Sequence, residues 1–260
     1  MHLWFSTQPL DSRIWEISEP RHREGVRSYL ILGDEAALLW DTGMGVGDIA
    51  AVVRAITDLP VTAVLSHADF DHVGGAAGFA SVLAADHPRI RRAQRGYSAA
   101  ALGGTYALSG FVDAPEGFDP AAFFVKPFGV ARHLKEGDVV DLAPFSFRVV
   151  AAPGHAPESI CLYDEASGLL LAGDALYDGP IYVSDPAACL ATFRKLAALA
   201  PRRILPAHNG SEFPPDLLPG LVGALERRPD LALGETSLVR GRLGALGTTC
   251  WGPLPEPSEI

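Results

Sequence analysis

Four metal-capable side chains fall within six residues of the stretch Ser66–Gly75, which has the sequence Ser-His-Ala-Asp-Phe-Asp-His-Val-Gly-Gly. They are His67, Asp69, Asp71 and His72. The apolar run Val61–Leu65 predicts a buried strand before them, and Gly74-Gly75 predicts a helix after them, over roughly residues 73–80. Imidazoles and carboxylates crowded onto one turn repel one another or lose hydration unless a cation neutralises them. The stretch therefore favours a metal site, with a solvated acidic loop as the alternative.

Three later segments each place a His or an Asp directly after an apolar strand. The residues are, in chain order, His155, Asp174 and His208. Functional loops of α/β folds gather at the C-terminal ends of strands. These three positions strengthen the prediction of a metal site.

Taken together, these motifs resemble those of the metallo-β-lactamase-fold hydrolases. That family has an Asp-Thr-Gly-type turn, the motif His-x-His-x-Asp-His, and then a His, an Asp and a final His. This chain has the same order from about Leu30 to His208, with Asp41-Thr42-Gly43, His67–His72, His155, Asp174 and His208. One position departs from the pattern, because Asp69 stands where the family usually has its second His.

The resemblance implies an α/β fold, the four-layer αββα sandwich. With 260 residues and 48% apolar content, the chain is long enough for one domain with a full core, so residues 1–260 are expected to form a single domain. The Gly- and Pro-rich stretch 231–260 is expected to be a C-terminal extension that wraps the surface or contributes to a homodimer contact.

The segment Arg89–Leu142 corresponds to a part of this fold that often covers the active site. Its aromatic residues line the substrate pocket or pack in the core, and they are Phe111, Phe118, Phe123, Phe124 and Phe128. It also carries a basic cluster formed by Arg89, Arg91, Arg92 and Arg95. A solvated helix face is favoured over an anion-binding site for this cluster.

The resemblance assigns two divalent metal ions to seven ligands. His67, Asp69 and His155 would hold one ion; Asp71, His72 and His208 would hold the other, with Asp174 bridging them. Zinc is the metal expected first. An additional carboxylate at position 69 favours harder ions, so iron and manganese are also expected candidates. The alternative is that one metal site is lost. Asp41 would hydrogen-bond around the metal turn without binding metal, or would only form an Asp-Thr-Gly turn.

Two metal ions close together share a hydroxide, which is a nucleophile that needs no Ser or Cys. Asp71 would also orient that hydroxide. Tyr177, three residues after Asp174, matches a Tyr of lactone-hydrolysing members and would donate a hydrogen bond to the developing oxyanion. The alternative is a core Tyr packed beside a helix that starts at Asp185.

The function predicted first is a metal-dependent hydrolase acting on a small-molecule ester, thioester or lactone. Two alternatives stay open. One is an iron-dependent oxygenase resembling persulfide dioxygenases, which reuse this fold. The other is a metal-binding protein without catalysis.

The charge balance argues against nucleic acid as a partner, because 31 acidic and 21 basic side chains give a net charge of −10 that repels phosphate backbones. No stretch approaches the roughly 18 apolar residues of a membrane span. The start, Met1-His2-Leu3, lacks the layout of a signal peptide, and three scattered cysteines are typical of buried thiols in a reducing cytoplasm. We therefore expect a cytoplasmic enzyme with a small-molecule substrate.

Overall fold

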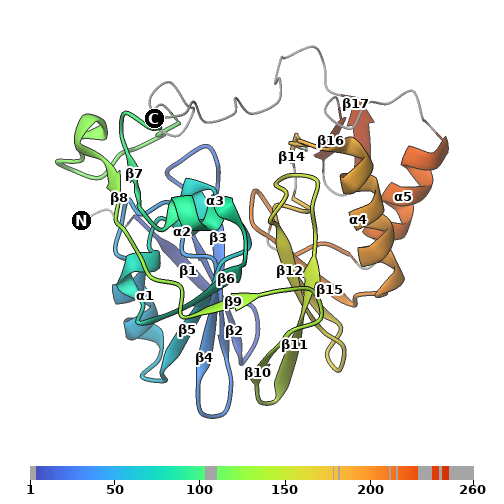
Figure 1. Cartoon of the computed structure of the whole chain (residues 1–260), viewed down its shortest axis with the longest axis horizontal. Coiled ribbons are helices and arrows are strands. Elements are labelled where there is room, and N and C mark those ends of the chain that lie inside the picture. Colours follow the sequence, from blue (N-terminus) through green and yellow to red (C-terminus); the bar gives the residue numbers. More distant parts are fainter. Residues whose placement is uncertain are drawn as a thin grey trace. The chain divides into compact units, whose positions relative to one another are not determined.

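The structure is a computed structural model that describes residues 4–102, 110–177, 179–180, 182–210, 212–214, 216–227, 236–239 and 242–245 (Figure 1). The chain divides into two compact units. The N-terminal unit comprises Met1–Lys135 and Asp141–Phe145, and the C-terminal unit comprises Glu136–Val140 and Ser146–Ile260. The single domain expected from the sequence therefore stays a prediction.

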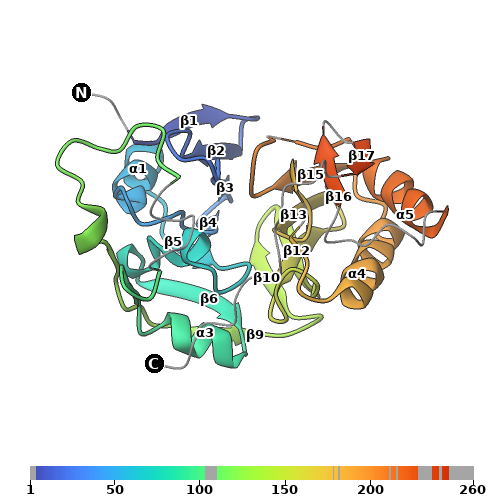
Figure 2. The same ribbon diagram turned by 90° about the horizontal axis from the view of Figure 1, so that it is seen from above.

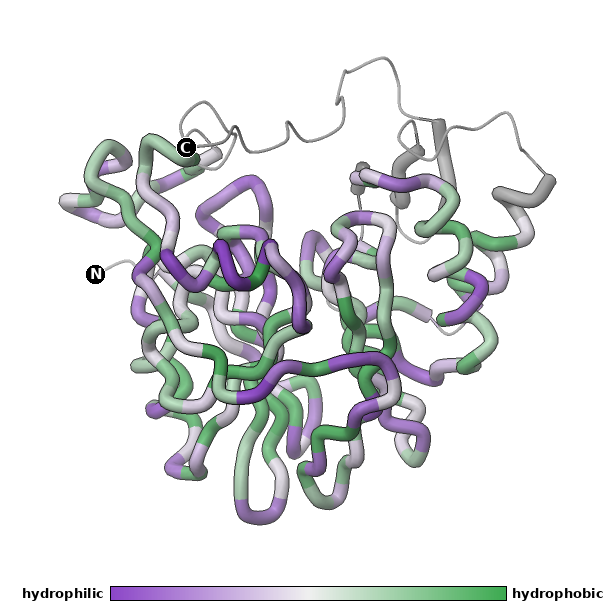
Figure 3. Tube along the Cα trace, in the orientation of Figure 1, coloured by the Kyte–Doolittle hydropathy of each residue, from purple (hydrophilic) through white to green (hydrophobic). Residues whose placement is uncertain are grey.

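The N-terminal unit is built on a seven-stranded sheet. Its strand order is β1 (Ser6–Pro9), β2 (Ile14–Ser18), β3 (Arg27–Leu32), β4 (Ala37–Trp40), β5 (Val61–Val64), β6 (Ser81–Ala85) and β9 (Arg132–Leu134). Strands β1 to β4 form antiparallel pairs, and β4, β5, β6 and β9 are parallel. The β3–β4 hairpin is apolar along its strands and hydrophilic at its tip, as Figure 3 shows.

Two helices bury their apolar faces on this sheet. Helix α1 (Ile49–Ile56) starts at Asp48, whose side chain accepts a hydrogen bond from Ala51 N at 2.9 Å, and Ile49 and Val53 pack with core residues of β2, β3 and β4. Helix α3 (Pro88–Ala93) packs with core residues of β5 and β6. Helix on sheet is the layer pattern that the αββα fold requires.

The helix predicted over residues 73–80 is wrong. In its place are the short helix α2 (Phe70–Val73) and a 3₁₀ turn, η1 (Ala76–Gly78). Gly74 lies so close to the preceding turn of the sheet that a Cβ atom would be 2.1 Å from the carbonyl carbon of Met44. Gly74 N donates to Gly43 O at 2.8 Å. The glycine is therefore present for close backbone approach and does not continue a helix.

The C-terminal unit is built on a second sheet. Its order is β10 (Val139–Leu142), β11 (Phe145–Ala151), β12 (Ile160–Asp164), β13 (Leu169–Gly173) and β15 (Arg203–Pro206). Strands β13 and β15 are parallel. Helices α4 (Pro186–Ala198) and α5 (Leu217–Arg227) lie side by side on this sheet in Figures 1 and 2, and Phe193 and Leu218 belong to one core cluster with strand residues such as Leu170.

The segment Arg89–Leu142 contributes to both sheets through β9 and β10. Between α3 and β9 it forms the small pair β7 (Tyr97–Ser98) and β8 (Phe124–Val125) and the turn η3 (Pro120–Ala122). Phe123 and Phe128 are buried in the core, whereas Phe124 is 48% exposed. Phe118 and Phe111 are partly buried and pack against core clusters. Core packing thus holds for four of the five phenylalanines, and the covering role of the segment stays a prediction.

Only eight residues of the predicted C-terminal extension lie inside the described part of the chain. They form β16 (Thr236–Val239) and β17 (Arg242–Ala245), which join β14 (Gly179–Pro180) in a three-stranded sheet. None of the helices in the described residues has the length and apolar character that a membrane crossing needs.

Candidate metal centre

The first group of predicted site residues lies at one edge of the N-terminal sheet. Strands β4 and β5 are parallel, so Asp41 after β4 and Ser66 after β5 emerge at the same edge. The side chains gathered there, here called the His67 cluster, are Asp41, Ser66, His67, Asp69, Asp71 and His72.

Asp41 connects Ser66 and His72 of the His67 cluster through hydrogen bonds to its carboxylate. Its backbone is left-handed, with φ of 59°, a conformation that Asp tolerates better than most residues. Its carboxylate accepts hydrogen bonds from Ser66 N at 2.7 Å and Ser66 Oγ at 2.8 Å, and from His72 Nδ1 at 2.9 Å. Thr42 Oγ1 adds a bond to His72 O at 2.9 Å. The Asp-Thr-Gly turn therefore fixes both the ring and the backbone of His72.

These partners determine which nitrogen of each ring carries the proton. The Ser66 hydroxyl donates to Asp41, so it accepts from His67 Nδ1 at 2.8 Å. The carboxylate of Asp41 likewise accepts from His72 Nδ1. In both rings Nδ1 is the donor, and Nε2 is left with the lone pair that binds metal.

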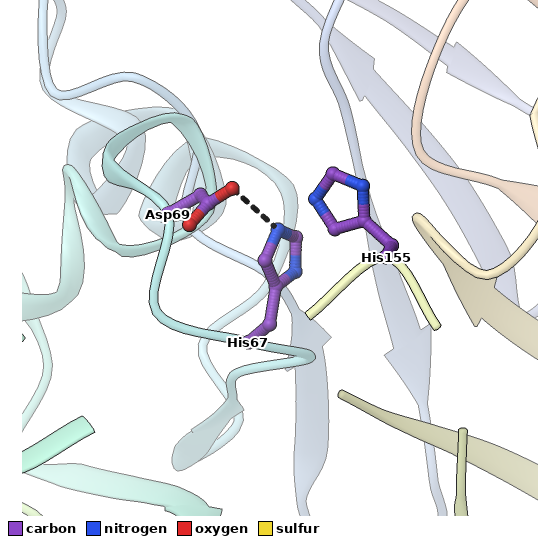
Figure 4. Close-up of side chains that lie close together, drawn as sticks. All are labelled: His67, Asp69 and His155. Atoms are coloured by element: carbon purple, nitrogen blue, oxygen red, sulfur yellow. Dashed lines mark ion pairs between the residues drawn. The ribbon is translucent and has the colours of Figure 1, made fainter. Parts of the chain in front are cut away.

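Each of these Nε2 atoms faces a carboxylate oxygen. His67 Nε2 is 3.5 Å from Asp69 Oδ2, the pair drawn with a dashed line in Figure 4. His72 Nε2 is 3.6 Å from Asp71 Oδ2. One ligand atom of His67 and one of His72 lie within 4.8 Å of each other. The stretch predicted to bind metal thus brings its four side chains into two facing pairs.

Asp69 has a second partner that the sequence did not indicate. Its Oδ1 accepts a hydrogen bond from Arg89 Nη2 at 2.6 Å, and the two residues form an ion pair. Arg89 therefore has a specific contact, in contrast to the predicted solvated face. Arg91 forms its own ion pair with Asp86.

Glu19, which follows β2, is another contributor that no motif indicated. Its carboxyl group is buried and accepts hydrogen bonds from Met44 N at 2.9 Å and from Trp4 Nε1. Burial raises the pKa of Glu19 to about 7, against the lowering effect of the hydrogen bonds from Met44 and Trp4. The charge of Asp71 raises this pKa further and that of His72 lowers it.

The second group of predicted residues lies at one edge of the C-terminal sheet. Strands β13 and β15 are parallel, so Asp174 and His208 follow strand ends at the same edge. His208 Nε2 is 3.1 Å from Asp174 Oδ1, and His155 Nε2, on the ring also drawn in Figure 4, is 3.6 Å from Asp174 Oδ2. These residues and Tyr177 are here called the Asp174 cluster.

A tight turn positions His155. Gly154 has φ of +144°, and a Cβ atom there would be 2.6 Å from the Cα of Cys189 in α4. Its carbonyl accepts hydrogen bonds from the start of α4, with Ser184 N at 2.7 Å. His155 Nδ1 donates to the carbonyl of Tyr182 at 3.2 Å, so in this ring too Nε2 carries the lone pair.

Tyr177 has features of both interpretations made from the sequence. It is 3% exposed, and its ring meets that of His208 edge to face, with centroids 5.2 Å apart. Its hydroxyl accepts a hydrogen bond from Tyr182 N at 2.9 Å. A hydroxyl can accept one hydrogen bond and donate another, and the role of Tyr177 as an oxyanion donor stays a prediction.

Two of the three cysteines, Cys161 and Cys189, lie within the described residues, buried and in no disulfide. Burial raises the pKa of the Cys189 thiol to about 12, with a further rise from the charge of Asp185. Cys189 is therefore not a thiolate nucleophile at neutral pH.

The imidazole nitrogens and carboxylate oxygens of each cluster are suitable ligands for a divalent metal ion. Four Nε2 atoms face carboxylate oxygens at 3.1–3.6 Å. Nδ1 is the donor in three of the rings, so in the neutral form of these rings Nε2 carries a lone pair. That lone pair and the facing carboxylate oxygen repel each other unless positive charge lies near both. Two ligands that are each about 2.1 Å from a tetrahedral zinc ion are about 3.4 Å apart, which matches these distances.

The comparisons with known proteins agree with this class of metal-dependent α/β protein. Residues 23–208 match the family described as the metallo-beta-lactamase superfamily. The acyl-coenzyme A thioesterase MBLAC2 of Gallus gallus is 33% identical over 189 residues, which cover 68% of this chain and 67% of that protein. The chain belongs to the metallo-beta-lactamase superfamily, whose members generally depend on divalent metal ions.

Solved structures share the fold. A metallo-beta-lactamase family protein from Thermus thermophilus is similar with a TM-score of 0.63 and 22% identity, covering 85% of this chain and 82% of that chain. A second, TTHA1623 in a di-iron-bound form, has a TM-score of 0.55 and 25% identity over 80% of this chain and 96% of that chain. The metallo-β-lactamase fold predicted from the motifs is confirmed, and the similarities support a hydrolase.

Proposed function

We propose that this chain is a metal-dependent hydrolase of small acyl thioesters that binds two divalent metal ions. The ligands are the seven residues predicted from the motifs: His67, Asp69, Asp71, His72, His155, Asp174 and His208. Zinc is the first expectation, and iron is supported by the relative that is described in a di-iron-bound form. A thioester is preferred over a lactone or an oxygen ester because of the MBLAC2 relatives, which are named acyl-coenzyme A thioesterases.

The observation that carries this function is the pairing of imidazole Nε2 atoms with carboxylate oxygens. Nδ1 of His67, His72 and His155 is held by Ser66, Asp41 and the Tyr182 carbonyl, respectively. Rings held in this way present a fixed lone pair, and such outer partners orient metal-binding histidines in general. A core histidine that serves only packing needs no carboxylate opposite its second nitrogen.

When bound, the metal ions supply a water that ionises near neutral pH and polarisation of the substrate carbonyl. Asp71 would orient this water toward the carbonyl carbon of the substrate. Tyr177 donates a hydrogen bond to the carbonyl oxygen as it gains negative charge. The carbon–sulfur bond then breaks, the sulfur leaves as a thiol with a proton from the water, and the acyl group leaves as a carboxylic acid.

Metal content tests the first half of this function. Metal-free protein is saturated with zinc, manganese or iron, desalted and measured by elemental analysis, and two ions per chain are expected. His155→Ala and His208→Ala should each lose about one ion, while His133→Ala, at an exposed histidine of β9, should keep both. A parent protein that retains no more than one ion under every condition would refute the two-metal site.

Turnover tests the second half. Protein loaded with metal is assayed on acyl-coenzyme A thioesters, lactones and oxygen esters, with thiol release monitored for the first class. The highest kcat/KM is expected on a thioester. Absence of turnover on all three classes would show a metal-binding protein without catalysis. Consumption of oxygen by the iron-loaded protein would favour the oxygenase.

A further inference from the structure

Asp69 and Arg89 contact each other in place of the interactions that are usual at their positions in α2 and α3. Asp69 is the N-cap residue of α2, where Asp is favoured because its side chain accepts a hydrogen bond from the first turn. Within the described residues, the side chain of Asp69 makes no such capping bond. Its two oxygens instead meet Arg89 Nη2 at 2.6 Å and His67 Nε2 at 3.5 Å.

Arg89 lies in the first turn of α3, directly after Pro88. A cation at that end of a helix opposes the helix dipole and is unfavourable there. The backbone is fixed there, because Arg89 N donates to Nδ1 of the N-cap residue His87 at 3.3 Å. The side chain is only 37% exposed. Residues that break local rules in this way are expected at functional sites.

Charge explains why the two residues are paired. An imidazole at position 69, as in the family pattern, is a neutral ligand, whereas a carboxylate brings one additional negative charge. A guanidinium 2.6 Å from one oxygen offsets that charge and leaves the other oxygen directed at His67 Nε2. Asp69 with Arg89 therefore presents about the same net charge as a histidine.

We propose that Arg89 is a positioning residue that makes Asp69 act as a charge-compensated substitute for histidine and so sets the preference between metal ions. Carboxylates favour hard ions such as manganese, and imidazoles favour zinc. Compensation by Arg89 keeps the preference for zinc in spite of the carboxylate. This inference rests on the proposed function, because it requires a metal ion beside Asp69.

The test is a competition titration of metal-free protein with zinc and manganese, which gives the ratio of the two affinities without any assay of activity. Arg89→Met keeps the apolar stem and removes the charge. We expect the ratio of zinc to manganese affinity to fall about tenfold or more, within the range typical of outer partners of metal ligands. Arg89→Lys, which keeps the charge but not the planar fork, should lie between Arg89→Met and the parent. The control is Arg91→Met, on the same helix and paired with Asp86 instead.

A double variant shows whether Arg89 acts through Asp69. With Asp69→His in place there is no carboxylate to compensate, so adding Arg89→Met should leave the ratio unchanged. An unchanged ratio in Arg89→Met alone would overturn the inference, and so would an equal shift in the Asp69→His background. Either result leaves the proposed function standing as long as the parent binds two ions. A parent that binds neither metal overturns the inference together with the proposed function.

Discussion

The two clusters hold their histidines by different means. In the His67 cluster the outer contacts come from side chains, since Ser66 and Asp41 accept from the rings and Arg89 holds Asp69. In the Asp174 cluster a backbone group orients the ring of His155, which donates a hydrogen bond to the carbonyl of Tyr182. A side chain that orients a ligand can be removed by a single substitution, whereas a backbone carbonyl can be disturbed only indirectly. We therefore expect point mutations to change metal preference most readily in the His67 cluster.

The largest effect is expected from Asp174, whose carboxylate faces two imidazoles. Asp174→Ala removes the partner of both His155 and His208, so metal affinity should fall sharply in spite of the intact backbone turn. Loss of metal activation is worth several kcal/mol, so we expect kcat/KM on a thioester to fall by about 10³ or more. Glu165→Gln, at an exposed carboxyl of the same unit, should change neither quantity. Full metal content in Asp174→Ala would remove this residue from the ligand set.

The next prediction concerns the carboxyl group of Glu19 near the His67 cluster and its effect on the free energy of unfolding. The pKa of Glu19 is raised from 4.5 to about 7, so the folded state binds the proton more tightly than the unfolded state. The stabilisation is fully present below about pH 4.5 and is lost as the pH rises through about 7, by about 3 kcal/mol. Glu19→Gln cannot ionise, so its free energy of unfolding should lose less between pH 5 and pH 8 than that of the parent.

Urea unfolding of metal-free protein at the two pH values measures this difference. Metal-free protein is needed because a bound cation would itself lower the pKa of a nearby carboxyl group. At pH 5 the variant should be slightly less stable, since an amide nitrogen cannot accept the hydrogen bond from Met44 or Trp4. If parent and variant lose stability in parallel, Glu19 does not titrate in this range.

A third substitution separates orientation by side chains from orientation by backbone. Asp41→Asn keeps the left-handed turn, which Asn also tolerates, but its amide NH₂ group can turn toward His72 Nδ1. The ring would then carry its proton on Nε2, where the metal should bind. We expect about 10- to 100-fold weaker metal binding, measured by titration. Asp58→Asn, at an exposed position, is the matched control, and equal affinities in the two variants would exclude a role for Asp41.

The motifs in the sequence predicted the fold and named the residues of the two clusters apart from Ser66, whose contacts with Asp41 and His67 no motif indicated. Motif residues such as His67 and Asp174 follow apolar strands, and parallel pairing then places strand ends at one edge of a sheet. The positions of these residues directly after strands were therefore enough to predict which of them lie close together. The departure at Asp69 was also visible, because the family pattern has a histidine there.

The outer contacts could not be predicted in the same way. The carbonyl of Tyr182 has no side-chain signature, and the pairing of Arg89 with Asp69 joins residues 20 positions apart. A weak signal existed for Arg89, since a cation directly after Pro88 opposes the helix dipole. Gly74 was misinterpreted as helical because the close approach of Met44 is a tertiary contact that composition does not record.

The last prediction tests what the Asp174 cluster does beyond binding metal. Tyr177→Phe keeps the ring that packs on His208 and removes the hydroxyl. Removal of one oxyanion donor typically costs about 10²–10³ in rate, and a fall of at least about tenfold in kcat on a thioester or lactone is expected.

The hydroxyl also accepts a bond from Tyr182 N, and the carbonyl of Tyr182 holds His155. Metal content and Tm must therefore be measured on the same samples. A fall in kcat with both unchanged assigns the hydroxyl to the substrate, because a role in holding His155 would cost metal as well. Turnover equal to that of the parent would exclude Tyr177 as the oxyanion donor and leave it a packing residue beside His208.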